Sequence, residues 1–193
     1  MSLRKISPVL FGTALLLGAT ALSAAGPSAA MLAGACAGCH GVDGSSVGPA
    51  SPSIAGMSEA YFTRSMEDFK SGERPSTIMG RIARGYTTEE IELMAGFFAA
   101  KPFVRYPQQT DAARVARGET LYDDACETCH SEKGAAADDD SGILAGQWLP
   151  YMTFTMQDFI SGVREMPKKM KKKVDRLDEA EIEALLQFFA SQQ

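Results

Sequence analysis

The apolar positions near the end of the chain recur at the spacing of an α-helix. Asp178 precedes this pattern as an N-cap, and Glu179 and Glu181 place negative charge in the first turn. A similar pattern begins at Thr87. The apolar positions of the two helices are Ile182, Leu185, Leu186 and Phe189 in one and Ile91, Met94, Ala95 and Phe98 in the other. No stretch alternates with period two for long enough to be a strand, so the pattern predicts an all-α protein.

Two further helices are predicted at about 58–71 and 147–161, and both end near a glycine, Gly72 or Gly162. The segments 41–56 and 131–146 are rich in Gly, Ser, Pro or Asp and are predicted to be loops. Each half of the chain is therefore expected to consist of three helices separated by two loops.

The chain contains an internal duplication. Tyr61 matches Tyr151 and Phe69 matches Phe159 at an offset of 90 residues, whereas Ile91 onward matches at an offset of 91. One residue has therefore been inserted between Gly162 and Ile182. Pro102 and Pro107 interrupt any helix between the copies. We predict two tandem domains, at 25–104 and 105–193.

The N-terminus predicts export. Arg4 and Lys5 are followed by a charge-free stretch of 14 residues, Val9 to Leu22, and then by small residues, which is typical of a secretory signal peptide. The stretch is shorter than the roughly 20 residues that cross a bilayer as a helix. We expect residues 1–24 to be removed after Ala24, the rest of the chain to have no membrane span, and the protein to function in the periplasm.

Charge excludes one class of partner. Without Arg4 and Lys5 the chain has 17 basic and 24 acidic residues, a formal net charge of −7. The excess of acidic residues argues against a nucleic-acid partner.

The cysteines lie in two CxxCH motifs, one in each copy. The members of the motifs are Cys36, Cys39 and His40, and Cys126, Cys129 and His130. On a helical turn the three side chains of one motif share a face. Two thiols can bond to the vinyl groups of a porphyrin while the imidazole binds the iron, so the motifs predict two covalently bound haem c groups. A thioredoxin-like site would need a strand-rich context, and a closed zinc site would have to draw four ligands from two halves that each look complete. Two ordinary disulfides would leave the repeated CxxCH spacing unexplained.

The second axial ligand of each iron is predicted to be a methionine. His40 and His130 are the only histidines, so bis-histidine ligation at both irons is impossible. The remaining candidates are methionine, lysine or an open site, and methionine suits electron transfer at relatively high potential. Met79 lies 12 residues before Ile91, and Met170 lies 12 before Ile182. The duplication favours Met79 and Met170, with Met166 as an alternative for the second haem.

The whole chain after the signal peptide resembles the dihaem class I cytochromes c. It is most similar to the cytochrome subunit of flavocytochrome c sulfide dehydrogenase. Three segments carry this resemblance: CAGCHGVDGSSVGPASPSIAG from Cys36, STIMGRIARGYT from Ser76 and GILAGQWLPY from Gly142. The resemblance implies that Pro49 supplies the carbonyl that accepts the N–H of His40. The second copy has no proline between Ser131 and Gly146, so the acceptor for His130 stays open.

The resemblance also implies a function. In that family an FAD-containing flavoprotein subunit oxidises sulfide, and electrons pass to the haems and then to a soluble acceptor such as another cytochrome c. This chain would then be an electron-transfer subunit and not an enzyme, because an iron with six ligands has no position for substrate. Two alternatives stay open: a free-standing dihaem carrier that delivers electrons to a terminal oxidase, and a haem enzyme with an open iron site.

Overall fold

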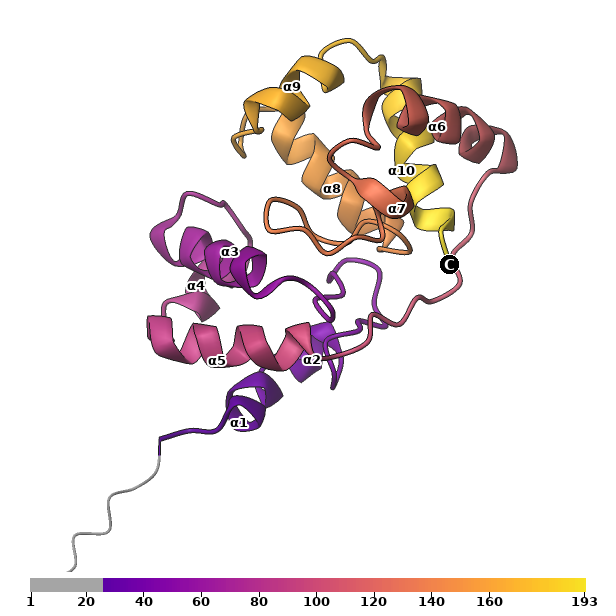
Figure 1. The fold of residues 1–193 in the computed structure, drawn as a ribbon. Coiled ribbons are helices and arrows are strands. Elements are labelled where there is room, and N and C mark those ends of the chain that lie inside the picture. The colour runs from indigo at the N-terminus through magenta and orange to yellow at the C-terminus, as the bar shows by residue number, and fades with distance from the viewer. Residues whose placement is uncertain (1–25) are drawn as a thin grey trace, which may run out of the picture.

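The structure, a computed structural model, describes residues 26–193, so the predicted signal peptide at 1–24 lies outside the described residues. Within this range the fold consists of ten α-helices and contains no strand, as predicted (Figure 1). The first half comprises α1 (Ala29–Gly34), α2 (Ala37–His40), α3 (Glu59–Ser71), α4 (Met79–Ala83) and α5 (Thr88–Ala99). The second half comprises α6 (Ala112–Ala125), α7 (Ser131–Gly134), α8 (Leu149–Ile160), α9 (Lys168–Val174) and α10 (Glu179–Ser191). None of the helices within 26–193 is long and apolar enough to cross a membrane.

Each half has its own apolar core. In the first half α5 packs against α1 and α3, and in the second half α10 packs against α6 and α8. Phe98 and Phe189, both on the closing helices, lie in the centres of these cores. Both closing helices begin with a capping box, from Thr87 to Glu90 and from Asp178 to Glu181, which confirms the predicted starts.

The two halves repeat the same backbone hydrogen bonds. The N–H of Gly56 donates to the carbonyl of Phe98 at 2.8 Å, and the N–H of Gly146 donates to the carbonyl of Phe189 at 2.8 Å. Gly44 and Gly134 both have positive φ, and a Cβ at either would lie less than 3.0 Å from a ring atom of the closing helix. These positions therefore require glycine in both copies.

The segment before each closing helix was predicted as a loop but contains a short helix, α4 or α9. Hydrogen bonds locate the inserted residue within the second of these segments. Arg74 to Asp68 and Arg164 to Asp158 are equivalent backbone bonds at an offset of 90. Farther on, the bond from the N–H of Gly85 to Ile82 matches that from Arg176 to Lys173 at an offset of 91. The inserted residue therefore lies between Arg164 and Lys173.

The two halves contact one another through buried polar groups. The side chain of Gln147, 1% exposed, accepts a hydrogen bond from the Ser53 N–H and donates one to the Ser53 carbonyl, both at 3.0 Å. The indole N–H of Trp148 donates to the carbonyl of Ser46 at 3.0 Å. Because buried backbone groups are costly to leave unpaired, these bonds fix the second half against the loop that follows His40.

The connection between the halves is not helical from 101 to 111. The start of this connection contacts the first half, since the N–H of Val104 donates to the Ser45 hydroxyl. From Arg105 it contacts the second half, since the side chain of Arg105 donates to the Ala145 carbonyl. The division into domains at 25–104 and 105–193 stays a prediction.

Candidate functional site

The first CxxCH motif forms a single helical turn at α2. The N–H groups of Cys39 and His40 both donate to the Cys36 carbonyl, at 3.2 and 2.9 Å. Cys36 is partly buried and Cys39 is exposed, and both thiols are free. Burial raises the pKa of the Cys36 thiol. The local backbone thus places two free thiols and one imidazole on the same turn.

The second motif has the same backbone arrangement at the end of α6. The N–H groups of Cys129 and His130 donate to the Cys126 carbonyl, at 3.1 and 2.9 Å. Both thiols are free, and burial raises the pKa of the Cys126 thiol. Both predicted haem attachment motifs therefore have the same local geometry.

The imidazole of His40 is held by Pro52, not by Pro49 as the sequence comparison implied. His40 is 8% exposed, and its Nδ1 lies 2.8 Å from the Pro52 carbonyl oxygen. A carbonyl can only accept, so Nδ1 carries the proton and Nε2 is left as the metal-binding nitrogen. The loop closes on itself through a bond from the Ser46 N–H to the Ser53 hydroxyl, 3.0 Å, and this closure presents Pro52 to the imidazole.

The imidazole of His130 lacks such an acceptor. Its Nδ1 is buried and forms no hydrogen bond with any residue that the structure describes. Burial lowers the pKa of His130, and the charge of Asp138 partly opposes this effect. The loop turns differently here, because Glu132 and Lys133 both have a φ of 56°. Sequence patterns give no signal for this turn, since neither residue is a glycine.

The methionines on α4 and α9 occupy equivalent places. Met79 lies five residues before Arg84, the C-cap of α4, and Met170 lies five before Asp175, the C-cap of α9. Both methionines are partly buried. This agreement in helical register supports the pairing of Met79 with Met170 that the sequence predicts.

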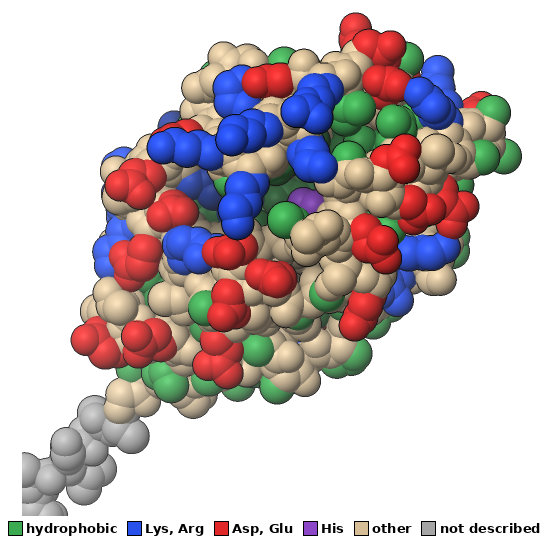
Figure 2. Space-filling view, turned by 45° about the horizontal axis from the view of Figure 1, so that its top comes forward, with side chains coloured by type: hydrophobic (Ala, Val, Ile, Leu, Met, Phe, Trp, Pro, Cys, Tyr) green, Lys and Arg blue, Asp and Glu red, His purple; other side chains and the backbone are tan. Residues whose placement is uncertain are grey.

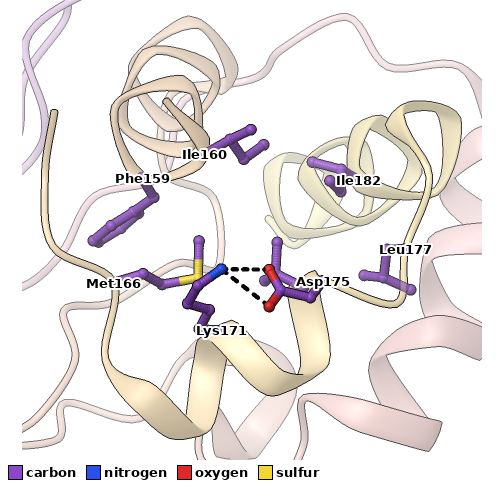
Figure 3. Close-up of a pocket in the computed structure, with 8 residues that line it drawn as sticks. Phe159, Ile160, Met166, Lys171, Asp175, Leu177 and Ile182 are labelled. Atoms are coloured by element: carbon purple, nitrogen blue, oxygen red, sulfur yellow. Dashed lines mark hydrogen bonds and ion pairs between the residues drawn. The ribbon is translucent and has the colours of Figure 1, made fainter. Parts of the chain in front are cut away.

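Met166 lies in a different environment. It is 8% exposed and lines a cavity of about 190 Å³ between α8, α9 and the start of α10 (Figure 3). Its thioether lies beside Phe159 and the Lys171–Asp175 ion pair, as Figure 3 shows. Neither His130 nor a cysteine lines this cavity. Met166 therefore has the surroundings of a packing residue.

Four residues at the contact between the halves form a reciprocal cluster that the sequence analysis did not identify as functional. Arg74 donates to the Tyr151 hydroxyl at 3.2 Å, across the two halves. The pKa of Tyr61 is lowered overall. Burial alone would raise it, but the charges of Arg74 and Arg164 outweigh the effect of burial. The two arginines repeat at an offset of 90, as do the two tyrosines, so the duplication contained a signal for this cluster.

The arginine charges are not neutralised by protein carboxylates. Among the ion pairs of residues 26–193, none involves Arg74 or Arg164. The guanidinium groups stack instead on Phe69 and Phe159, at 4.5 and 4.3 Å from the ring centres. The charge of Arg74 adds to burial in lowering the pKa of Arg164. Two partly buried cations without a carboxylate partner would favour the binding of an anion.

These observations test whether the residues suit covalently bound haem. Each half offers two free thiols on one turn, an adjacent imidazole and a thioether, which together form the donor set of a c-type haem. The buried Nδ1 of His130 is a polar atom that the described protein atoms leave without a hydrogen bond, and the charges of Arg74 and Arg164 have no carboxylate partner among the described residues. No three His, Cys, Asp or Glu side chains in the described part of the chain converge as a bare metal ion would require. The residues fit haem better than an isolated ion.

Comparison with known proteins gives the class. Residues 24–98 match the family model described as cytochrome c, and residues 113–189 match that of cytochrome C oxidase, cbb3-type, subunit III. Cytochrome c4 of Pseudomonas aeruginosa is 33% identical over 171 residues, 82% of this chain and 84% of that protein. The crystal structure of cytochrome c4 from Pseudomonas stutzeri superposes with a TM-score of 0.75 and 26% identity, covering 88% of this chain and 100% of that one.

A second relative matches a shorter stretch with higher identity. The cytochrome subunit of sulfide dehydrogenase from Chlorobaculum tepidum is 56% identical over 63 residues, 33% of this chain. The match spans 56% of that relative's length. The fold and the paired motifs define an electron-transfer protein with two covalently bound haem c groups. The chain belongs to the dihaem class I cytochromes c, the family of cytochrome c4.

Proposed function

We propose that this chain is the electron-accepting subunit of a sulfide-oxidising flavocytochrome c complex in the periplasm. The observation that carries the proposal is the stretch of 63 residues that is 56% identical to the cytochrome subunit of sulfide dehydrogenase. Oxidation of sulfide belongs in this scheme to an FAD-containing partner subunit, and a soluble protein such as another cytochrome c takes the electrons onward.

The residues that hold the haems in this proposal are those of the two motifs together with one methionine in each half. They are Cys36, Cys39, His40 and Met79 for the first haem and Cys126, Cys129, His130 and Met170 for the second. Bound haem supplies one-electron chemistry at iron. Pro52 orients the imidazole of His40. Arg74 and Arg164, which form no ion pair among the described residues, would bind the acidic side chains of the haems.

The surface of the first half supports a permanently bound partner. Val42 and Val47, in the loop after His40, are 79% and 73% exposed. Ile78 and Ile82, which flank Met79, are also exposed. Permanent subunit interfaces are more apolar than the rest of a protein surface. A flavoprotein subunit that covered these side chains would remove them from water and would lie beside the first haem.

The experiment is purification of the affinity-tagged chain from the periplasm of its own host, followed by intact-mass measurement and sulfide titration. We expect two haems, a mature chain that starts at residue 25, a co-purified flavoprotein and haem reduction when sulfide is added. In Cys126→Ala/Cys129→Ala only the first haem should remain thioether-linked under denaturing conditions. A monomeric cytochrome without flavin would overturn the proposal.

One observation favours a second candidate function. The similarity to cytochrome c4 extends over 82% of the chain, whereas the sulfide dehydrogenase relative matches only 33%. A free-standing dihaem carrier that delivers electrons to a terminal oxidase is therefore the alternative. It predicts a monomer whose haems are oxidised by membranes that contain the oxidase and are not reduced by sulfide.

A further inference from the structure

The surfaces next to the two methionines have diverged since the duplication. At the offset of 91, Met79 and Met170 are equivalent, but their neighbours differ in charge. The first copy has Thr77, Ile78, Gly80, Arg81 and Ile82, and the second has Lys168, Lys169, Lys171, Lys172 and Lys173. The same backbone element thus presents one positive charge on α4 and five on α9.

The lysines of α9 are available to a partner. All five are exposed, and Lys171 pairs with Asp175 at 2.7 Å. In the range that the structure covers, the other four form no ion pair. Five lysines in seven consecutive residues repel one another, and a partner of opposite charge would offset that repulsion.

The lysine surface lies beside the second haem site. Burial raises the pKa of the Cys126 thiol, and the positive charge of Lys173 partly opposes this shift. No cation contributes in this way at Cys36. Figure 2 shows Lys and Arg side chains gathered along one rim of a hollow in which a histidine is visible. Positive charge therefore gathers beside a hollow in which a histidine reaches the surface.

The rest of the second half has the opposite sign. Residues 106–193 include 16 acidic and 10 basic residues, so that only five of the basic residues lie outside α9. The lysine surface is thus a concentrated positive region on a negative domain. Such a distribution orients an incoming charged protein and raises the rate of its association.

We propose that the α9 lysine surface, Lys168–Lys173, docks a soluble acidic redox protein that accepts one electron from this cytochrome. The inference rests on the proposed function and deepens it, because it assigns the outgoing electron to the second half. One electron leaves the reduced protein and reduces the acceptor's redox centre by one, and no bond forms or breaks. The first half, where Ile78 and Ile82 take the places of Lys169 and Lys173, is left for the permanent subunit.

An acidic protein explains the surface better than an anionic membrane does. The lysines lie on a seven-residue helix that has no apolar face for insertion, because Met170 and Val174, its other residues, are partly buried. A transient redox partner needs fast association and release, and exposed charge provides both.

The experiment compares two matched double variants of the free dihaem protein. Lys169→Glu/Lys172→Glu alters α9, and Arg81→Glu/Arg84→Glu alters the exposed surface of α4; each changes the net charge by the same amount. The probe is oxidised plastocyanin, an acidic blue-copper protein, and stopped flow gives the second-order rate constant for oxidation of the reduced cytochrome. At low ionic strength we expect the α9 variant to be slower by about tenfold or more, and the α4 variant by less than about twofold.

Added salt should slow the wild type and the α4 variant, while the α9 variant should lose most of its salt dependence. Equal slowing of the two variants would show an effect of net charge alone and would overturn the proposal. Unchanged rates in the α9 variant would do the same. Loss of binding to phosphatidylglycerol vesicles without any change in the plastocyanin rate would reassign the surface to membranes. The assay contains no flavoprotein, so failure of the sulfide dehydrogenase assignment would be seen separately, in the purification.

Discussion

Arg74 of the first half donates a hydrogen bond to the hydroxyl of Tyr151 in the second, at 3.2 Å. The same guanidinium reaches Ser65 at 3.1 Å and stacks on Phe69. The Arg74 side chain thus connects α3, which contains Ser65 and Phe69, to the second half. Because Arg164 and Tyr61 occupy the equivalent places, the contact between the halves is built from the same pair used twice.

We predict that Tyr151→Phe and Arg74→Gln each lower the free energy of unfolding by about 1–3 kcal/mol, since a bond to a charged group is lost. The double variant should lose less stability than the sum of the losses in the two single variants, because both changes remove the same interaction.

Arg74→Gln should also lower the reduction potential of one haem by tens of millivolts or so, because a nearby cation favours the reduced form. Denaturant unfolding and spectroelectrochemistry measure the two effects.

Arg117→Gln serves as the control for these variants. Arg117 lies on α6 in an exposed ion pair with Glu181, where little stability is at stake. Its potential and unfolding should match the wild type. Strict additivity of Tyr151→Phe and Arg74→Gln would show that the hydrogen bond between the halves does not contribute to stability.

The identity of the second methionine ligand gives another prediction. In Met170→Ala one haem should lose the weak long-wavelength absorption from sulfur to ferric iron. In Met166→Ala the absorption should stay, but the protein should be destabilised by about 2–4 kcal/mol, because a buried side chain leaves a cavity. Met79→Ala removes the band of the other haem and calibrates the signal. Loss of the band in Met166→Ala alone would reassign the ligand.

Much of the fold follows from local pattern. The closing helices were predictable because their apolar spacing, caps and acidic first turns agree, and α3 and α8 because apolar stripes end at Gly72 and Gly162. The short helices α4 and α9 were missed, since five to seven residues give too little periodicity. The left-handed turn at Glu132 and Lys133 was not predictable, because neither residue type favours it.

The candidate site was likewise predictable from the sequence only in part. The spacing of Cys36, Cys39 and His40 specifies one helical turn, so the motif geometry could be predicted. The hydrogen-bond acceptor for His40 could not be predicted, because the closure of the loop through Ser46 and Ser53 decides which carbonyl faces the imidazole ring. Contacts between residues far apart, such as Gln147 and Ser53, follow from the packing of the halves and have no local signal.

Gln147 provides a prediction about that packing. Gln147→Ala should lower the free energy of unfolding by about 2–4 kcal/mol, because the buried N–H and carbonyl of Ser53 lose their partners. We expect the two halves to unfold at more widely separated denaturant concentrations, monitored by the Soret bands. Gln157→Ala, on the exposed face of α8, should change stability by less than about 0.5 kcal/mol. Similar losses in both variants would count against a special role for Gln147.

The crossing of α6 and α10 depends on Gly118. A Cβ at this position would lie 2.1 Å from the carbonyl oxygen of Ala184 and 2.7 Å from Phe188 Cβ. Gly118→Ala should therefore force the helices apart and cost about 1–3 kcal/mol or more in thermal or denaturant unfolding. Gly96→Ala, on α5, meets no atom closer than 3.9 Å and should be neutral or stabilising by up to about 1 kcal/mol. Equal stability of the two variants would contradict the close helix contact.

Tyr122 links the second haem motif to the core and makes stability depend on pH. Its hydroxyl donates to the His130 carbonyl at 2.9 Å and accepts from the Lys133 N–H at 2.8 Å, so Tyr122→Phe should cost about 1–2 kcal/mol at neutral pH. Burial raises the pKa of Tyr122 above its usual value, so the folded state keeps a proton that the unfolded state loses above about pH 10. The stability difference between wild type and Tyr122→Phe should therefore shrink as the pH rises through this range. Denaturant unfolding at pH 8 and at pH 10.5 tests this, and a difference that grows with pH would show that the hydroxyl ionises more readily in the folded protein.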